Sequence, residues 1–194
     1  MTGRLGLLGG TFDPPHIGHL VAAVHSRSQL RLDHVVVVPA GDPWQKSGAR
    51  DVTPAEVRLE MVRAACEGLE GVVVSDVEVR RQGPSYMIDT VEELTAAGER
   101  AVLLLGADAA AGLPTWHRAE ELATRVDVAW FDRPGSPAPE LAPEWRLCHL
   151  ALPHLDVSST QLREWAASGR PLDVLVPAEV VSIVRRRGLY RGSR

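Results

Sequence analysis

The sequence predicts an α/β fold, a Rossmann-like doubly wound parallel sheet with helices at the carboxyl-terminal end. Short apolar runs alternate along the chain with segments of helical periodicity, which is typical of parallel strands connected by helices. Four consecutive valines at 35–38 form a run that suits a strand covered on both faces. From residue 158 onward, two helical segments follow each other, separated by Gly169-Arg170-Pro171.

The individual elements follow from periodicity and from the residues that end each run. We expect strands at residues 4–8, 35–38, 72–79, 101–105, 126–131 and 145–152. We expect helices at residues 17–32, 54–69, 86–97, 118–124, 159–168 and 178–187. Thr53 is the expected N-cap of the second helix, with Pro54 as its first residue. Segments 39–53 and 132–143 are rich in Gly, Pro or Asp and are predicted to be loops.

Length and charge limit the classes of protein. A chain of 194 residues suits one domain, here 1–194, with a helical part from about 158. The net charge of −4 argues against nucleic-acid binding, which depends on a basic surface. No leader pattern and no apolar run of about 18 residues are present, so we expect a cytoplasmic protein without a membrane partner. The oligomeric state stays open at this stage.

Two cysteines, Cys66 and Cys148, are the only ones in the sequence, and they form no CxxC pair. A zinc site and a disulfide framework are therefore not expected, and we predict no protein-held metal. We expect both cysteines to be buried thiols.

The segment GGTFDPPHIGHL, residues 9–20, lies where the first strand gives way to the first helix. In a doubly wound sheet this turn is at the edge where ligands bind. Gly9 and Gly10 allow backbone amides to approach a phosphate, and the next helix begins with unpaired N–H groups. His16 and His19 would face the same side and donate to a phosphate. A plain glycine turn with incidental histidines is the alternative.

This segment resembles the GGxFDPxHxGH signature of the HxGH nucleotidyltransferase superfamily. The resemblance implies that Gly9, Gly10, Thr11, Phe12 and His19 bind ATP, and that both histidines are catalytic. A dinucleotide-binding module without catalysis would need GxGxxG at this turn, and the glycines present do not have that spacing.

A second motif, VSSTQLREW at residues 157–165, begins a predicted helix. Ser158 or Ser159 can cap this helix, and Gln161 completes a capping-box pattern with Ser158. The segment is similar to the ISSTxxR motif of the same superfamily. That similarity implies that Ser158, Ser159 and Arg163 hold the β and γ phosphates of ATP.

Over nearly its whole length the chain resembles the bacterial nicotinate-nucleotide adenylyltransferases. The further matching segments are PAGDPWQKSG, GPSYMIDTVEEL, LLLGADAAAGLPTWH, WFDRPG and VPAEVVSIVRRRGLY. The chain departs from the family pattern at four positions: Trp44 and Gln45 stand before Lys46, Met87 replaces a threonine, and Ala119 replaces a second tryptophan. The first departure leaves the contacts of that loop in doubt.

The resemblance implies roles for residues in these segments. Gly106 and Asp108 would contact the adenosine part of ATP, although Asp108 as a helix N-cap is an alternative. Nicotinate mononucleotide would be bound by residues around a stacking tryptophan, namely Lys46, Ser85, Tyr86, Thr90 and Trp116. We assign the other tryptophans at 130, 145 and 165 to packing, and the histidines at 25, 34, 117, 149 and 154 to the surface or core.

The implied reaction is transfer of AMP from ATP to nicotinate mononucleotide, in NAD biosynthesis, with release of pyrophosphate. Catalysis would rest on His16, His19, Lys46 and Arg163, and Mg²⁺ would be bound mainly through the ATP phosphates. Three alternatives remain: a preference for nicotinamide mononucleotide, pantetheine-phosphate adenylyltransfer, and a nucleotide-sensing module without catalysis.

Overall fold

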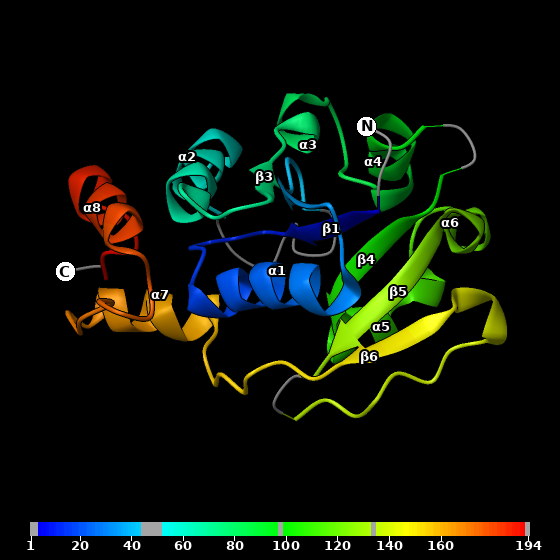
Figure 1. Cartoon of the computed structure of the whole chain (residues 1–194). Helices are drawn as coiled ribbons and strands as arrows, with labels where there is room; N and C mark the ends of the chain where they lie inside the picture. Colours follow the sequence, from blue (N-terminus) through cyan, green and yellow to red (C-terminus); the bar gives the residue numbers. More distant parts are fainter. Residues whose placement is uncertain (1–3, 44–51, 97–98, 133–134, 193–194) are drawn as a thin grey trace.

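A computed structural model describes residues 4–43, 52–96, 99–132 and 135–192. Within these residues, six parallel strands form one sheet in the order β3-β2-β1-β4-β5-β6. The strands are β1 (Leu5–Gly10), β2 (His34–Pro39), β3 (Val72–Val74), β4 (Ala101–Gly106), β5 (Val126–Phe131) and β6 (Leu147–Leu150). The strand order reverses between β1 and β4, and this confirms the predicted doubly wound α/β fold (Figure 1).

The helices of the described residues divide between the two faces and one end of the sheet. They are α1 (Ile17–Leu30), α2 (Ala55–Cys66), α3 (Val77–Arg80), α4 (Met87–Leu94), α5 (Ala107–Ala111), α6 (Ala119–Arg125), α7 (Ser159–Ala167) and α8 (Ala178–Arg187). Two short 3₁₀ helices, η1 (Leu113–Thr115) and η2 (Pro143–Trp145), complete the set. Helices α7 and α8 lie together beside α2, at one end of the sheet (Figure 1).

Alternation along the strands explains which helices cover which face. Leu7, Val36 and Leu103 point to the face covered by α4, α5 and α6, where they pack in one buried cluster. Their neighbours Val35 and Leu104 point to the other face and pack with α1 and α2. A third cluster joins α2 to α7 and α8, so the helical end shares its core with the sheet domain.

Several expected elements differ from the structure. The expected strand at 72–79 ends at Val74, and its second half is the helix α3. Ser75 and Asp76 explain the break, because the Ser75 hydroxyl accepts a hydrogen bond from the Val77 amide and Asp76 is the N-cap. Helix α2 begins at Ala55 with Pro54 as its N-cap residue, instead of beginning at Pro54 with a Thr53 cap.

Other differences concern length and burial. The last strand covers only Leu147–Leu150, because the 3₁₀ turn η2 occupies the start of the expected run. Helix α5 and the turn η1 were not expected. Cys66 is buried as predicted, but Cys148 is exposed on the edge strand β6, which corrects that expectation. No helix in the described part of the chain is long and apolar enough to span a membrane.

Candidate active site

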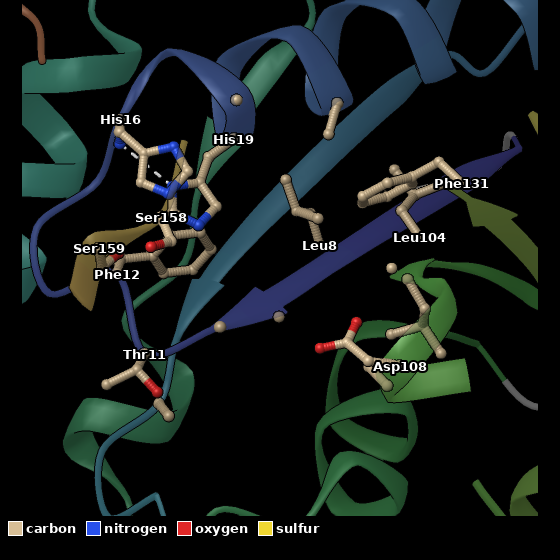
Figure 2. Close-up of a pocket in the computed structure, with 18 of the residues that line it drawn as sticks. Leu8, Thr11, Phe12, His16, His19, Leu104, Asp108, Phe131, Ser158 and Ser159 are labelled. Carbon is tan, nitrogen blue, oxygen red and sulfur yellow. Dashed lines mark hydrogen bonds between the residues drawn. The ribbon is translucent and has the colours of Figure 1, made fainter. Parts of the chain in front are cut away.

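A cavity of about 440 Å³ lies at the carboxyl ends of β1, β4 and β5, beside the first turns of α1 and α7. This is the edge where the strand order reverses, the usual ligand site of such a sheet. Figure 2 shows the two histidines and the two serines on one side and Asp108 on the other. The predicted site residues that line the cavity are Gly9, Gly10, Thr11, Phe12, His16, His19, Ser85, Tyr86, Gly106, Asp108, Trp116, Ser158, Ser159 and Arg163.

Two predicted residues are not among them. Lys46 lies outside the described residues, so its predicted contact stays a prediction. Thr90 is described but does not line the cavity, because its side chain is buried and its hydroxyl donates to Glu78 Oε1 at 2.7 Å. In this structure Thr90 supports a neighbouring carboxyl group.

The last two residues of β1 have little room for a side chain, because other side chains lie close to where a Cβ would be. A Cβ on Gly9 would lie 2.7 Å from the Met87 methyl carbon, and one on Gly10 would lie 3.0 Å from the Phe12 ring. Phe12 itself has a left-handed backbone, with φ 50°, and its ring is buried. The chain therefore bends sharply at Phe12, and the backbone of Gly9 and Gly10 borders the cavity.

Helix α1 begins with the two histidines. His16 is the N-cap residue and is 2% exposed, while its backbone N–H donates to His19 Nδ1 at 3.1 Å. Because Nδ1 of His19 accepts this bond, a neutral His19 ring carries its proton on Nε2. The two ring centroids lie 3.7 Å apart, and the Phe12 ring meets His19 edge-on at 4.8 Å. The stack holds the His19 ring in a defined orientation at the cavity.

The second motif bonds directly to the turn of the first. Ser158 caps α7 by accepting from the Gln161 amide at 3.2 Å, as the sequence predicted. Ser159 Oγ donates to the Pro14 carbonyl at 2.9 Å, and Arg163 donates to the Asp13 carbonyl at 2.6 Å. The side chains of α7 that are predicted to bind phosphate therefore also hold the turn that precedes the two histidines.

Arg58 was missed by the sequence analysis, although it holds three segments of the site together. Its guanidinium is 1% exposed and donates to the carbonyls of Thr11, Gly41 and Thr53 at 2.9, 3.0 and 2.7 Å. Thr11 belongs to the first turn, while Gly41 and Thr53 lie on either side of the segment that contains Lys46. Nothing in the spacing of the RLEMV run distinguishes this arginine from a solvated one.

Another part of the cavity lining is aromatic. The Tyr86 and His117 rings stack with their centroids 4.1 Å apart, and Trp116 lies next to His117 on the cavity lining. His117 and His154, which the sequence assigned to the surface or core, are exposed residues, and both also line the cavity. Only the folded chain brings His117 against Tyr86, so the sequence carried no pattern for it.

Arg118 holds this aromatic segment against α4. Its guanidinium bonds to Asp89 and Glu92 of α4 and to Glu121 of α6, at 3.2, 2.9 and 2.6 Å. The hydrogen bonds that Arg118 donates to the carboxylates of Glu121 and Glu92 raise the pKa of Arg118, so the guanidinium stays charged. Asp108 does not cap a helix, because Gly106 is the N-cap of α5 and Asp108 lies exposed in its first turn.

Glu78 is a buried carboxyl group on the cavity lining, and it is 4% exposed. Burial raises the pKa of Glu78, which outweighs the lowering by hydrogen bonds with Thr90 and Ser85 and by the charge of Arg81. Asp89 adds a smaller raising effect. The carboxyl group thus stays protonated to a higher pH in the folded chain than in the unfolded chain.

This shift predicts a pH dependence of stability. The unfolded chain loses the Glu78 proton near its ordinary pKa of about 4.3, whereas the folded chain keeps it to a higher pH. The free energy of unfolding should therefore fall as pH rises from that value through the folded-state pKa. We expect Glu78→Gln to weaken this fall, measured as urea midpoints between about pH 4 and about pH 7. The exposed control Glu140→Gln should keep the wild-type slope; equal slopes in all three proteins would contradict the assignment.

Comparisons with known proteins show the family to which the chain is related. A family model described as Cytidylyltransferase-like matches residues 7–165. A probable nicotinate-nucleotide adenylyltransferase from Acidothermus cellulolyticus is 42% identical, covering 98% of this chain and 97% of its own. A protein of the same description from Roseiflexus sp. is 43% identical, covering 96% and 98%.

Solved structures of the same name share the fold. The nicotinic acid mononucleotide adenylyltransferase of Plasmodium falciparum, complexed with NaAD, matches with a TM-score of 0.75 at 16% identity, covering 96% of this chain and 97% of its own. A putative nicotinate-nucleotide adenylyltransferase from Vibrio parahaemolyticus matches with a TM-score of 0.68 at 20% identity, covering 98% and 96%. These two structures support the fold, and the relatives at 42% and 43% identity show that the chain belongs to the nicotinate-nucleotide adenylyltransferase family.

Proposed function

We propose that this protein transfers AMP from ATP to nicotinate mononucleotide, which gives nicotinate adenine dinucleotide and pyrophosphate. The observation that supports this most directly is that residues of both phosphate motifs and a group of aromatic residues line the same cavity. His19, Ser158 and Arg163 line one part of this cavity, while Tyr86 and Trp116 line another. The relatives named as probable nicotinate-nucleotide adenylyltransferases match this chain over nearly their whole length.

The chemistry is a direct displacement at phosphorus. A 5′-phosphate oxygen of nicotinate mononucleotide forms a bond to the α-phosphorus of ATP. The bond from that phosphorus to the oxygen bridging the β-phosphorus breaks, and pyrophosphate leaves with the electron pair. No covalent enzyme intermediate is needed, so catalysis depends on positioning and on charge stabilisation.

The cavity residues have corresponding roles. His19 would donate from Nε2 to an oxygen of the reacting phosphates, since its Nδ1 accepts from the His16 backbone. The first turn of α7 and Arg163 would stabilise the leaving pyrophosphate, with Lys46 as a further point charge. Gly106, at the end of β4, and Asp108, in the first turn of α5, would border the adenosine.

Mg²⁺ would enter with the triphosphate, whose oxygens and bound water supply most of its ligands. This arrangement fits the donor set, since no group of three His, Cys, Asp or Glu side chains in the described segments could hold a metal. Chelation of the ion should therefore stop pyrophosphate release and leave the fold unchanged by circular dichroism.

The test of the function is pyrophosphate release from Mg-ATP with each acceptor supplied alone. We expect release with nicotinate mononucleotide and much slower release with nicotinamide mononucleotide or phosphopantetheine. Release only with phosphopantetheine would reassign the acceptor, and ATP binding without release would indicate a nucleotide sensor. Faster release with nicotinamide mononucleotide would show that the protein prefers an acceptor with an amide on the pyridine ring to one with a carboxylate.

Trp116 supplies a prediction for the acceptor side. A flat ring beside the cavity can stack on the pyridinium of the acceptor, an attraction of about 0.5–2 kcal/mol. We expect Trp116→Ala to raise KM for nicotinate mononucleotide by roughly 2- to 30-fold while KM for ATP stays near the wild-type value. Trp116→Phe keeps a ring and should recover part of the loss. An equal rise in both KM values would show that Trp116 acts on the whole cavity.

A further inference from the structure

Asp13 lies at the bend of the first turn, and its carboxylate is bonded by two distant parts of the chain. Its side chain is 1% exposed. Oδ1 accepts a hydrogen bond from the Tyr190 hydroxyl at 2.7 Å, and Oδ2 accepts from the Thr53 backbone N–H at 3.4 Å. A buried carboxylate depends on such donors, because burial removes its hydration.

Tyr190 comes from the far end of the sequence, 177 positions after Asp13 and just beyond α8. Its backbone is left-handed, with φ 59°, so the chain turns there after Gly188 has ended the helix. Burial and the neighbouring Asp13 charge raise the pKa of the Tyr190 hydroxyl well above its ordinary value. The hydroxyl therefore remains a protonated donor throughout the neutral range.

The main chain of the same turn is bonded from another direction. The carbonyls of Asp13 and Pro14 accept from Arg163 and Ser159 of α7. The side chain of Asp13 is thus bonded by the end of the chain and by the residue before Pro54, while its carbonyl is bonded by the second motif. His16 follows only three residues later, so a shift of this bend would move the N-cap of α1 and the His19 ring stacked on it.

We propose that Tyr190 is a positioning residue for the reaction: its hydroxyl, bonded to Asp13 Oδ1, holds the turn at residues 11–16 in the geometry that presents His19 to the phosphates. This rests on the proposed nucleotidyl transfer. Tyr190 acts through Asp13 and not by touching the substrate, and it does not line the cavity.

The proposal predicts a loss on the ATP side. Tyr190→Phe removes one oxygen and keeps the ring, so kcat/KM for ATP should fall about tenfold while KM for the acceptor stays unchanged. Asp13→Ala should lower kcat/KM for ATP by at least as much as Tyr190→Phe does. The double variant should be no worse than Asp13→Ala alone, because the hydroxyl has then lost its acceptor. If the alanine variant does not fold, Asp13→Leu takes its place in this cycle, because leucine has a similar shape and also lacks an acceptor for the Tyr190 hydroxyl.

Ser182→Ala is the matched control, since it removes a hydroxyl from α8 that bonds only to the Ala178 carbonyl of its own helix in the described structure. It should keep the wild-type rate. A lower unfolding midpoint of Tyr190→Phe with an unchanged kcat/KM would reduce Tyr190 to a structural role and overturn the proposal. So would strictly additive losses in the double variant.

Measurements on the wild type distinguish a failure of the proposed function from a failure of the positioning role of Tyr190. If the wild type releases pyrophosphate only with another acceptor, the acceptor assignment fails and the same cycle is run with the active one. If no acceptor supports release, the cycle is measured as the dissociation constant of Mg-ATP, which Tyr190→Phe should raise several-fold. An unchanged dissociation constant would then overturn the positioning role as well.

Discussion

His19→Ala is expected to lose about 10²–10³ in kcat while remaining folded. The His16 amide fixes the neutral His19 ring as an Nε2 donor, and the stacked His16 ring sets its direction toward the cavity. Removing one donor aimed at developing phosphate charge costs about 3–4 kcal/mol of transition-state stabilisation. The lost contact with the His16 amide should cost only about 1 kcal/mol of stability. Steady-state pyrophosphate release together with circular dichroism measures both effects.

His25→Ala is the control for this prediction, because His25 lies exposed on the same helix α1. It should have the wild-type kcat. A His19→Ala variant within a few-fold of the wild type would remove His19 from the mechanism, and the stacked histidines would then be only a helix cap.

Arg58→Met is expected to cause the largest loss of stability among these variants. Methionine keeps much of the volume but leaves the carbonyls of Thr11, Gly41 and Thr53 without the donors that Arg58 supplies in the buried interior. An unsatisfied buried polar group costs about 1–3 kcal/mol, so we expect a loss of roughly 3 kcal/mol or more in the free energy of unfolding. Urea denaturation measures this loss of stability. We expect kcat to fall as well, because Thr11 belongs to the turn at residues 11–16 that precedes His19.

Arg80→Met is the matched control, because Arg80 is an exposed arginine that bonds to Asp76 on the surface. It should cost less than about 1 kcal/mol. Arg58→Lys should lie between the two, since an ammonium cannot reach three carbonyls with the geometry of a guanidinium. A loss for Arg58→Met no larger than that for Arg80→Met would show that the three bonds contribute little to stability.

The central strands β2 and β4 could be predicted from sequence because each contains a long uninterrupted apolar run. The valines of β2 and the run of β4 have few polar atoms to place, so burial between two helical layers is their most stable arrangement. The predicted ends of helices differ from the observed ends by one to three residues. Helix α2, for example, was expected at 54–69 and covers Ala55–Cys66. The prediction that the strand continues after Val74 was wrong, because the Val77 N–H donates to the Ser75 hydroxyl and this local bond favours a helical turn over a longer strand.

The site divides in the same way. Local motifs carry their own chemistry, so the glycine turn, the paired histidines and the Ser158 cap were visible in the sequence alone. Arg58, Tyr190 and His117 were not, because their role depends on partners 47, 177 and 31 positions away. The contact of Lys46 stays a prediction, as do the substrate contacts of all the residues named.

The doubly wound α/β fold, the family and the two phosphate motifs follow from the order of neighbouring residues, so they can be predicted from the amino-acid sequence. The bonds between the two motifs, the buried groups that hold the turn at Asp13 and the contact of Thr90 with Glu78 are visible only in the folded chain. A buried polar atom must find a partner wherever the folded chain brings one, and sequence separation does not restrict that choice.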